Sequence, residues 1–500
     1  MSDPAESSLF RRALPRRDWL RCAVSGGVLT GSGLFGTGLF GTGLLANALF
    51  GSRSARAETG AGTRGDGKDF LAGVRRVKSV IVVFTSGGQS QIDLWDPKPL
   101  APREIRGEFE AIRASVPGTL LGEHLPRLAS LAHKYTLVRS MSHRDADHGS
   151  AVYLTLTGQY HQRITSNPQV RPTDLPSLQS VYKRLRPEAR CVDPSVQING
   201  PAIVAPNDIA PGQFGGLLGR EFDPLFVGNV LQDDGVVPGL DALEGLSTVR
   251  QTQRERLLAQ VAPRADMAAK PQWADFDHLQ QRAFDLISDP QTRRAFDLGA
   301  EPDSVRERYG RSRGGRSCLL ARRLVEAGVP FVTVVWNHHN RGQDEEPHDE
   351  EAYGWDTHND IFESLKNRLL PRFDRSLSAL IEDLDERGLL DETLVVCVGE
   401  FGRAPLVALE PNFKGATPGR KHWASAYSIL LAGGGTAAGK VVGRTDQQGA
   451  WPASEAYGPW DLAATLYAAL GIDPAGHYFD PQQRPYPLCA GQPIRAVYEG

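Results

Sequence analysis

The sequence predicts an α/β fold in which a mostly parallel central sheet carries helices on both faces. Short runs of β-branched and apolar residues alternate along the chain with amphipathic helical patterns, which is typical of parallel sheets. Glycine or polar residues follow each run, as they do in sheets that bind ligands at the carboxyl ends of their strands. The predicted strands are Ser79–Thr85, Pro330–Trp336, Thr393–Val398 and Tyr427–Ala432.

The helical patterns fall between and after these strands. Ser317–Gly328 has amphipathic spacing and ends in glycine, a common helix stop. Ile361–Leu389 carries apolar residues at helical spacing and forms one long helix or two helices broken near an internal proline. Pro459–Leu470 begins with proline, which suits the first turn of a helix. We therefore expect one α/β domain over residues 76–500, with a charged, helix-like insertion around residues 240–312.

Residues 1–57 have the features of a twin-arginine signal peptide. The pair Arg16 and Arg17 comes before 28 uncharged, glycine-rich residues that end at Phe50, and residues 55–57 form a small-x-small cleavage pattern. A membrane anchor is the alternative, because 28 uncharged residues are long enough to span a bilayer. The glycine content and the cleavage pattern favour a removed signal, so we expect a periplasmic or extracellular protein. Membrane contact is expected only if the leader stays uncleaved.

The charge balance argues against non-specific nucleic-acid binding. The chain has 56 basic and 59 acidic residues, and its first 57 residues hold seven of the former and three of the latter. The remainder carries 49 basic against 56 acidic residues, a net charge of −7. Residues 58–75 are rich in glycine and charge and are predicted to form a flexible lead-in.

The five cysteines show neither a CxxC nor a zinc-finger spacing. One disulfide is possible in an oxidising compartment, and the spacing does not select its members. We expect structural roles for all of them. They are Cys22, Cys191, Cys318, Cys397 and Cys489.

Polar clusters that contain acidic and histidine residues follow the predicted strands. Because the carboxyl ends of parallel strands meet at one edge of a sheet, these side chains can converge on one point. Carboxylates and imidazoles together suit a divalent ion, with zinc, calcium and magnesium all possible. The candidate metal ligands are Asp93, Asp356, His358, Glu400 and His422.

Structural roles stay open for the same residues. Glu400 and Arg403 can pair with each other, because a buried carboxylate needs a partner. His422 can be a hydrogen-bonded imidazole in the core beside Trp423. No cluster is specific by itself, and only their order along the chain favours a shared site.

A further cluster, Ser142–Ser150, leads into a predicted helix. Backbone N–H groups at the start of a helix favour an anion, and Arg144 can pair with its oxygen atoms. An ordinary helix cap formed by Asp147 or Ser150 explains the same residues. The two interpretations carry equal weight.

Taken together, the motifs resemble bacterial domain-of-unknown-function family 1501. The segment Gly87–Pro99 is similar to the opening signature of that family, and six further segments follow in the same order to the C-terminus. The family in turn resembles sulfatases and the alkaline phosphatase superfamily, whose members hydrolyse phosphate or sulfate esters at one or two divalent ions. The later matching segments are Pro211–Gln213, Glu307–Gly310, Leu320–Gly328, Trp355–His358, Gly399–Arg403 and His422–Trp423.

The resemblance implies a role for each candidate ligand. Asp93 matches the metal carboxylate that follows the first strand of the superfamily. Asp356 and His358 match an aspartate–histidine ligand pair. Glu400 stands where an aspartate usually follows a central strand, and His422 matches the late histidine ligand.

Three positions depart from the superfamily pattern. Phe401 stands where two-metal members have a histidine, which argues against a full second metal site. The position of the sulfatase nucleophile falls on His148, and no Cys-x-Pro-x-Arg motif is present, so formylglycine chemistry is excluded. Lys421 stands where the family more often has an aspartate.

We therefore expect an exported, metal-dependent hydrolase that acts on phosphate or sulfate esters of small molecules or polysaccharides. His148 would be a ligand, a general base or a nucleophile. Arg144, Arg403 and Lys421 would offset negative charge in the transition state. Two other interpretations stay open: a non-catalytic metal-containing binding or scaffold protein, and a protein whose polar clusters only support loops.

Overall fold

A computed structural model describes most of the chain after residue 73. The predicted signal peptide, nearly all of the lead-in, Cys22, Cys191 and the predicted insertion up to residue 289 lie outside the described residues. Among the helices that are described, none combines the length and the apolar character needed to cross a bilayer. The described residues are 74–186, 193–204, 208–228, 230, 290–337, 339–340 and 353–499.

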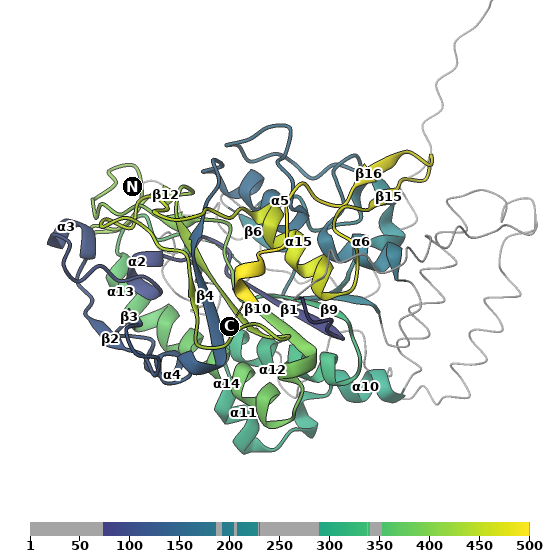
Figure 1. Ribbon diagram of the computed structural model, residues 1–500, viewed down its shortest axis with the longest axis horizontal. Coiled ribbons are helices and arrows are strands. Elements are labelled where there is room, and N and C mark those ends of the chain that lie inside the picture. The colour runs from purple at the N-terminus through teal and green to yellow at the C-terminus, as the bar shows by residue number, and fades with distance from the viewer. Residues whose placement is uncertain are drawn as a thin grey trace, which may run out of the picture. The chain divides into compact units, whose positions relative to one another are not determined.

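A central sheet of eight strands runs through the described part of the chain, in the order β14-β4-β13-β10-β1-β9-β5-β8 (Figure 1). Only β13 is antiparallel to its neighbours, β10 and β4, so the predicted mostly parallel sheet is confirmed. Four strands, β4, β5, β8 and β14, are additional to the predicted ones. The bounds are β1 Ser79–Phe84, β4 Tyr135–Met141, β5 Ser195–Ile198, β8 Leu225–Val227, β9 Phe331–Val335, β10 Thr393–Val398, β13 Tyr427–Gly433 and β14 Val441–Val442.

Helices cover both faces of this sheet, as predicted. Side chains alternate along β1, so that Ile81 and Val83 pack into one apolar core while Val80, Val82 and Phe84 pack into another. Figure 1 shows the two helical layers on either side of the strands. The helices of the first core are α4 Pro126–Ser130, α12 Arg313–Glu326 and α14 Leu370–Glu386, and those of the second are α5 His148–Thr157, α6 Leu178–Leu185 and α15 Pro459–Ala469.

The predicted helix over residues 361–389 is continuous in the structure, apart from a change of winding. It begins as α13, Ile361–Ser364, passes through a π-helical turn at Leu365–Leu369, and continues as α14. Pro371 lies in the first turn of α14, directly after the π-helical turn. The π-helical turn therefore takes the place of the predicted break.

Two short elements lie beyond the carboxyl end of β10. Strand β11, Gly402–Arg403, pairs with β12, His422–Trp423, in an antiparallel ribbon that places Arg403 opposite His422. Helix α5 begins at His148, soon after β4 ends. The residues that follow β1, β9 and β10 therefore meet α5 and this ribbon at one edge of the sheet.

Candidate metal centre

Asp356 lies at the centre of three histidines. Its Oδ2 is 3.1 Å from Nε2 of His148, and its Oδ1 is 3.1 Å from Nε2 of His358 and 3.2 Å from Nε2 of His422. The Nε2 atoms of His358 and His422 are 2.9 Å apart. Ligand atoms of His148, Asp356 and His422 all lie within 4.8 Å of one another, a spacing suited to a single ion.

These side chains come from three separate parts of the chain. His148 is the first residue of α5, and His422 lies in β12, where its Nδ1 is 2.8 Å from the carbonyl oxygen of Ala146. Asp356 and His358 belong to the segment before α13. The hydrogen bond at Nδ1 directs Nε2 of His422 toward Asp356. The predicted convergence of distant stretches is thus present for these four residues.

Glu400 reaches this cluster through His148. Its Oε1 is 2.6 Å from Nδ1 of His148 and accepts a hydrogen bond from the N–H of Gly87 at 2.8 Å. The Glu400 side chain is fully buried at the carboxyl end of β10. Asp356 and Glu400 therefore contact opposite nitrogens of the same imidazole.

Arg403 pairs with Asp356 rather than with Glu400. Its Nη2 lies 2.7 Å from Oδ1 of Asp356, and the guanidinium also donates to the carbonyl oxygens of Gly87, Gly88 and Arg420. The side chain is completely buried. The open alternative of a Glu400–Arg403 pair is not what the structure shows, and the Arg403 guanidinium is already bonded on all sides.

Burial and charge act in opposite directions within the cluster. Burial opposes the ionised form of Asp356, but the positive charges of His148 and Arg403 outweigh it and hold the pKa of Asp356 well below its usual range. Burial also opposes a charged His148, yet the carboxylates of Asp356 and Glu400 raise its pKa to about 9. Burial and the neighbouring charge of His148 lower the pKa of His422 to about 3. His422 is therefore a neutral imidazole, the form that binds metal ions.

Asp93 lies in a separate ion pair and does not join the cluster. Nε and Nη2 of Arg420 are 2.8 and 3.0 Å from its two carboxylate oxygens. The hydroxyl of Ser90 donates to Oδ2 of Asp93 at 2.5 Å, and both charged side chains are fully buried. The predicted metal ligand is thus engaged by a bidentate arginine, which uses both oxygens.

The other two predicted cationic residues also lie away from the cluster. Arg144 is exposed and its guanidinium lies 5.0 Å from the centre of the Tyr160 ring. Lys421 is 61% exposed and forms an ion pair of 3.0 Å with Glu410. In the described structure neither faces Asp356.

The start of α5 is capped by a neighbouring loop. The N–H of Gly149 donates to Oδ1 of Asn167, and the N–H of Ser150 donates to the carbonyl oxygen of Ser166. Asp147 occupies the N-cap position, but its carboxylate accepts no capping hydrogen bond from a backbone N–H of the helix. Because these amides already have acceptors, the structure favours a capped helix over an anion site here, but Asn167 and Ser166 supply the acceptors in place of the expected Asp147 or Ser150.

Sequence reasoning assigned no role to several residues that the site uses. His143 is buried, with Nε2 2.7 Å from the carbonyl oxygen of Glu400, and burial lowers its pKa to about 4. Phe413 stacks on the ring of His358 with a centroid distance of 3.8 Å. Arg420 holds Asp93. His143 stood within a polar cluster that the sequence singled out, whereas a stacking Phe413 has no local signal.

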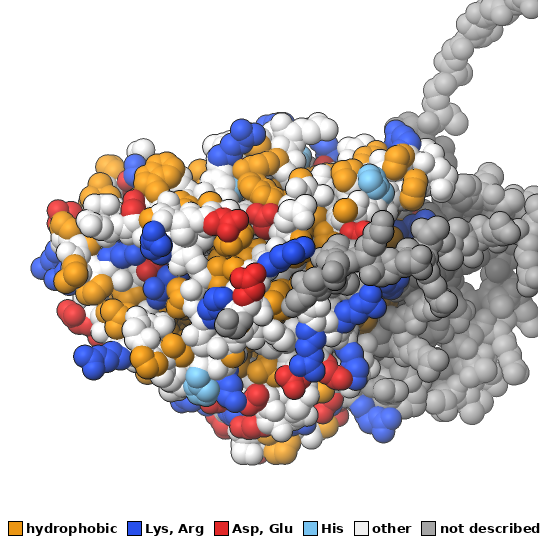
Figure 2. Space-filling model, in the orientation of Figure 1, with side chains coloured by type: hydrophobic (Ala, Val, Ile, Leu, Met, Phe, Trp, Pro, Cys, Tyr) orange, Lys and Arg blue, Asp and Glu red, His pale blue; other side chains and the backbone are white. Residues whose placement is uncertain are grey.

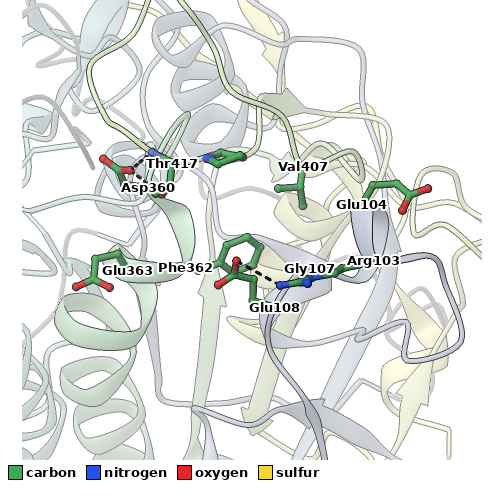
Figure 3. Close-up of a pocket in the computed structure, with 10 residues that line it drawn as sticks. Arg103, Glu104, Gly107, Glu108, Asp360, Phe362, Glu363, Val407 and Thr417 are labelled. Carbon is green, nitrogen blue, oxygen red and sulfur yellow. Dashed lines mark hydrogen bonds and ion pairs between the residues drawn. The ribbon is translucent and has the colours of Figure 1, made fainter.

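A pocket of about 580 Å³ lies outside this cluster (Figure 3). It opens near Asp360, which lies two residues beyond His358. The carboxylate of Asp360 accepts hydrogen bonds from the N–H and the hydroxyl of Thr417. No cluster residue lines it. Its lining comprises Arg103, Glu104, Gly107, Glu108, Asp360, Phe362, Glu363, Val407, Thr417 and Pro418.

Fold and site together define an α/β protein with a candidate His/Asp/His metal centre beyond the carboxyl ends of its parallel strands. The chain belongs to the family described as protein of unknown function DUF1501, whose model matches residues 77–498. The family predicted from the motifs is therefore confirmed. A search of the curated proteins finds no match.

Solved structures similar to this chain include enzymes of the kind that the resemblance predicted. A phosphonate monoester hydrolase from Silicibacter pomeroyi has 13% identity over 85% of this chain and 77% of its own, with a TM-score of 0.38. The PsFucS1 sulfatase from Pseudoalteromonas sp. has 13% identity over 79% and 68%, with a TM-score of 0.36. An alkaline phosphatase from the Antarctic bacterium TAB5 has 12% identity over 80% and 99%, with a TM-score of 0.35.

Proposed function

We propose that this chain is an exported, metal-dependent hydrolase of phosphate or sulfate esters. The observation that carries the proposal is the convergence of three imidazole Nε2 atoms on the carboxylate of Asp356. Export is supported by the paired arginines and the cleavage pattern of the leader. In an active site that has no activated side-chain nucleophile, a bound divalent ion can supply the nucleophile from water.

The donor set fits one ion of the zinc class. Three imidazoles and one carboxylate are nitrogen-rich, whereas calcium and magnesium prefer oxygen ligands. Nε2 of His148 is buried and lies 3.1 Å from Oδ2 of Asp356 without the geometry of a hydrogen bond, and the Nε2 atoms of His358 and His422 face each other at 2.9 Å. A cation between these atoms would satisfy their lone pairs. His148, Asp356, His358 and His422 would hold it.

The remaining residues prepare this centre for ester chemistry. When bound, the ion would polarise the ester oxygen and lower the pKa of a water molecule. Arg403 fixes Oδ1 of Asp356 and offsets its charge. Phe401 packs 4.6 Å from the ring of His422 and 5.0 Å from that of His148, which makes this wall apolar and strengthens electrostatic interactions beside it.

A non-catalytic metal-binding protein is the second candidate, and one feature of the cluster favours it. Arg403 is fully bonded, and Arg144 and Lys421 lie elsewhere, so the described cluster offers no unpaired arginine or lysine to an anionic ester. The side chains of His148, Asp356 and His358 are also at least nine-tenths buried, and only His422, at 19% exposure, is more open.

Metal analysis followed by an ester panel tests the proposal. Protein folded in the cell should carry about one equivalent of a zinc-class ion, and Asp356→Asn and His422→Ala should lose it. His133→Ala, at a histidine that is outside the cluster and bonded to Ser115, is the matched control and should retain it. Cleavage of phosphate or sulfate esters by the wild type, absent in the two cluster variants, supports the hydrolase. Metal without cleavage supports the second candidate, and absence of metal overturns both.

A further inference from the structure

We infer that Glu400 is a positioning residue that orients His148 and does not itself bind the ion. This differs from the ligand role that the family resemblance implies for Glu400. It rests on the metal centre of the proposed function but is independent of ester cleavage. The inference follows from the order in which the two carboxylates and the imidazole are arranged.

His148 lies between the two carboxylates. Nδ1 is 2.6 Å from Oε1 of Glu400, and Nε2 is 3.1 Å from Oδ2 of Asp356. The carboxylate of Glu400 accepts the proton of Nδ1 and keeps it on that nitrogen, so that Nε2 is the nitrogen that gives up its proton to an incoming cation. Glu400 is thus on the side of the ring that faces away from the other three ligands.

The backbone around Gly87 keeps the carboxylates in these different places. The N–H of Gly87 donates to Oε1 of Glu400, while its carbonyl oxygen accepts from Arg403, which binds Asp356. Gly87 has a φ of +114°, and a Cβ atom there would lie 2.5 Å from the backbone nitrogen of Asp356. One turn after β1 therefore sets the positions of both carboxylates.

Glu400 is held by its backbone as well as by its side chain. Its carbonyl oxygen is 2.7 Å from Nε2 of His143, and the residue directly follows the buried strand β10 and Gly399. Its side chain is completely buried, with Oε1 shared between His148 and Gly87. Asp356 also pairs with the guanidinium of Arg403, whereas the partners of the Glu400 carboxylate are His148 and the N–H of Gly87. The two acidic residues therefore have separate functions.

A double-mutant cycle with zinc distinguishes positioning from ligation. We would measure zinc affinity by competition with a chromophoric chelator for the wild type, Glu400→Gln, His148→Ala and the double variant. Loss of a supporting carboxylate should weaken zinc binding about ten- to a hundredfold. In the His148→Ala background the Glu400→Gln change should have almost no further effect, because its partner is gone. Losses that multiply would show direct ligation and overturn the inference.

A second measurement covers the case in which His148→Ala no longer binds zinc or no longer folds. In ¹⁵N-histidine spectra of the wild type, Nδ1 of His148 should be protonated and Nε2 should shift when zinc is added. In Glu400→Gln this tautomer preference should weaken, while Glu410→Gln, at a half-buried carboxylate paired with Lys421, should match the wild type. A zinc-induced shift at Nδ1 overturns the inference. A wild type that binds zinc but cleaves no ester leaves the inference standing and contradicts only the hydrolase.

Discussion

Two buried aspartates in this chain have different partners, and the partners determine what each can do. Asp356 contacts three imidazoles and one guanidinium, whereas Asp93 contacts Arg420 and Ser90. A bidentate arginine occupies both oxygens of a carboxylate. Asp93 therefore has the burial expected of a metal ligand, but it serves as one half of an ion pair.

Removing the charge of Asp93 should destabilise the fold without removing the metal. Asp93→Asn leaves Arg420 buried and unpaired, which we expect to cost about 3–5 kcal/mol of the free energy of unfolding. Glu410→Gln breaks the pair with Lys421, whose ammonium side chain is 61% exposed, and should cost less than about 1 kcal/mol. Urea denaturation gives the stability, and metal analysis of the folded fraction gives occupancy. Loss of metal from folded Asp93→Asn would contradict the pairing.

Gly87 and Gly118 form a matched pair for testing the turn after β1. Both have positive φ, of +114° and +81°, but only at Gly87 would a Cβ meet backbone atoms, those of Asp356, Asn340 and Trp355. Gly118→Ala should therefore cost about 1 kcal/mol from the backbone conformation alone. Gly87→Ala should cost more and also weaken metal binding, because Asp356 must move. Equal effects of the two substitutions on metal affinity would refute this role of the turn.

At the scale of elements, α14 caps a helix that is distant in sequence. Asp374 of α14 accepts hydrogen bonds of 2.9 Å from the N–H groups of Arg127 and Leu128 at the start of α4. The carboxylate thus replaces a local N-cap, since Leu125 at that position has no capping side chain. This contact joins α4 to the layer that contains α12.

The pH dependence of stability should reveal this buried carboxyl group. Burial raises the pKa of Asp374 to about 6, although the two N–H groups oppose the shift. The pKa in an unfolded chain is about 3.9. Between these values the folded protein keeps a proton that the unfolded chain has lost. The contribution of Asp374 to the free energy of unfolding therefore falls as pH rises from about 4 to 6, by up to about 3 kcal/mol.

Asp374→Asn removes this dependence. The stability of the variant relative to the wild type should improve by that amount as the pH is raised from 4 to 7, as measured by urea denaturation at each pH. If plots of the free energy of unfolding against pH run parallel for the two proteins between pH 4 and 7, Asp374 does not titrate as expected.

At the scale of the whole molecule, the described surface is of mixed character. Figure 2 shows basic, acidic and apolar side chains interspersed on the face in view, as expected for a chain with 56 basic and 59 acidic residues. Figure 1 shows that the elements carrying the candidate metal centre come from both halves of the described chain, with α5 from the first half and β12 from the second. These two parts of the chain must therefore fold together before the candidate centre exists, which suits the proposed export in a folded state.

Export should depend on the second arginine pair of the leader. Arg16→Lys with Arg17→Lys should keep the full-length protein in the cytoplasm, because the paired arginines are the recognised feature. Arg11→Lys with Arg12→Lys changes the neighbouring pair in the same way and should leave export intact. Cell fractionation with an epitope at the C-terminus measures both, and equal export of the two variants would contradict a twin-arginine route through Arg16 and Arg17.

Local patterns were sufficient for the fold class but not for all of the sheet. A strand buried on both faces must be continuously apolar, which made β1, β9, β10 and β13 recognisable. Strands β5, β8 and β14 are two to four residues long, too short for such a pattern. The antiparallel direction of β13 depends on its pairing with β10 and β4, and no residue type in the strand encodes it.

The sequence by itself determined the family, the α/β class and the candidate residues Asp356, His358 and His422, because apolar periodicity and the residues after each strand are local properties. Only the tertiary structure decided the partners: Arg420 for Asp93, His148 for Glu400 and Arg403 for Asp356. The first two of these contacts join residues 327 and 252 positions apart. The geometry of a hydrogen bond depends on where the sheet brings two segments together, and for such distant residues no local pattern carries that information.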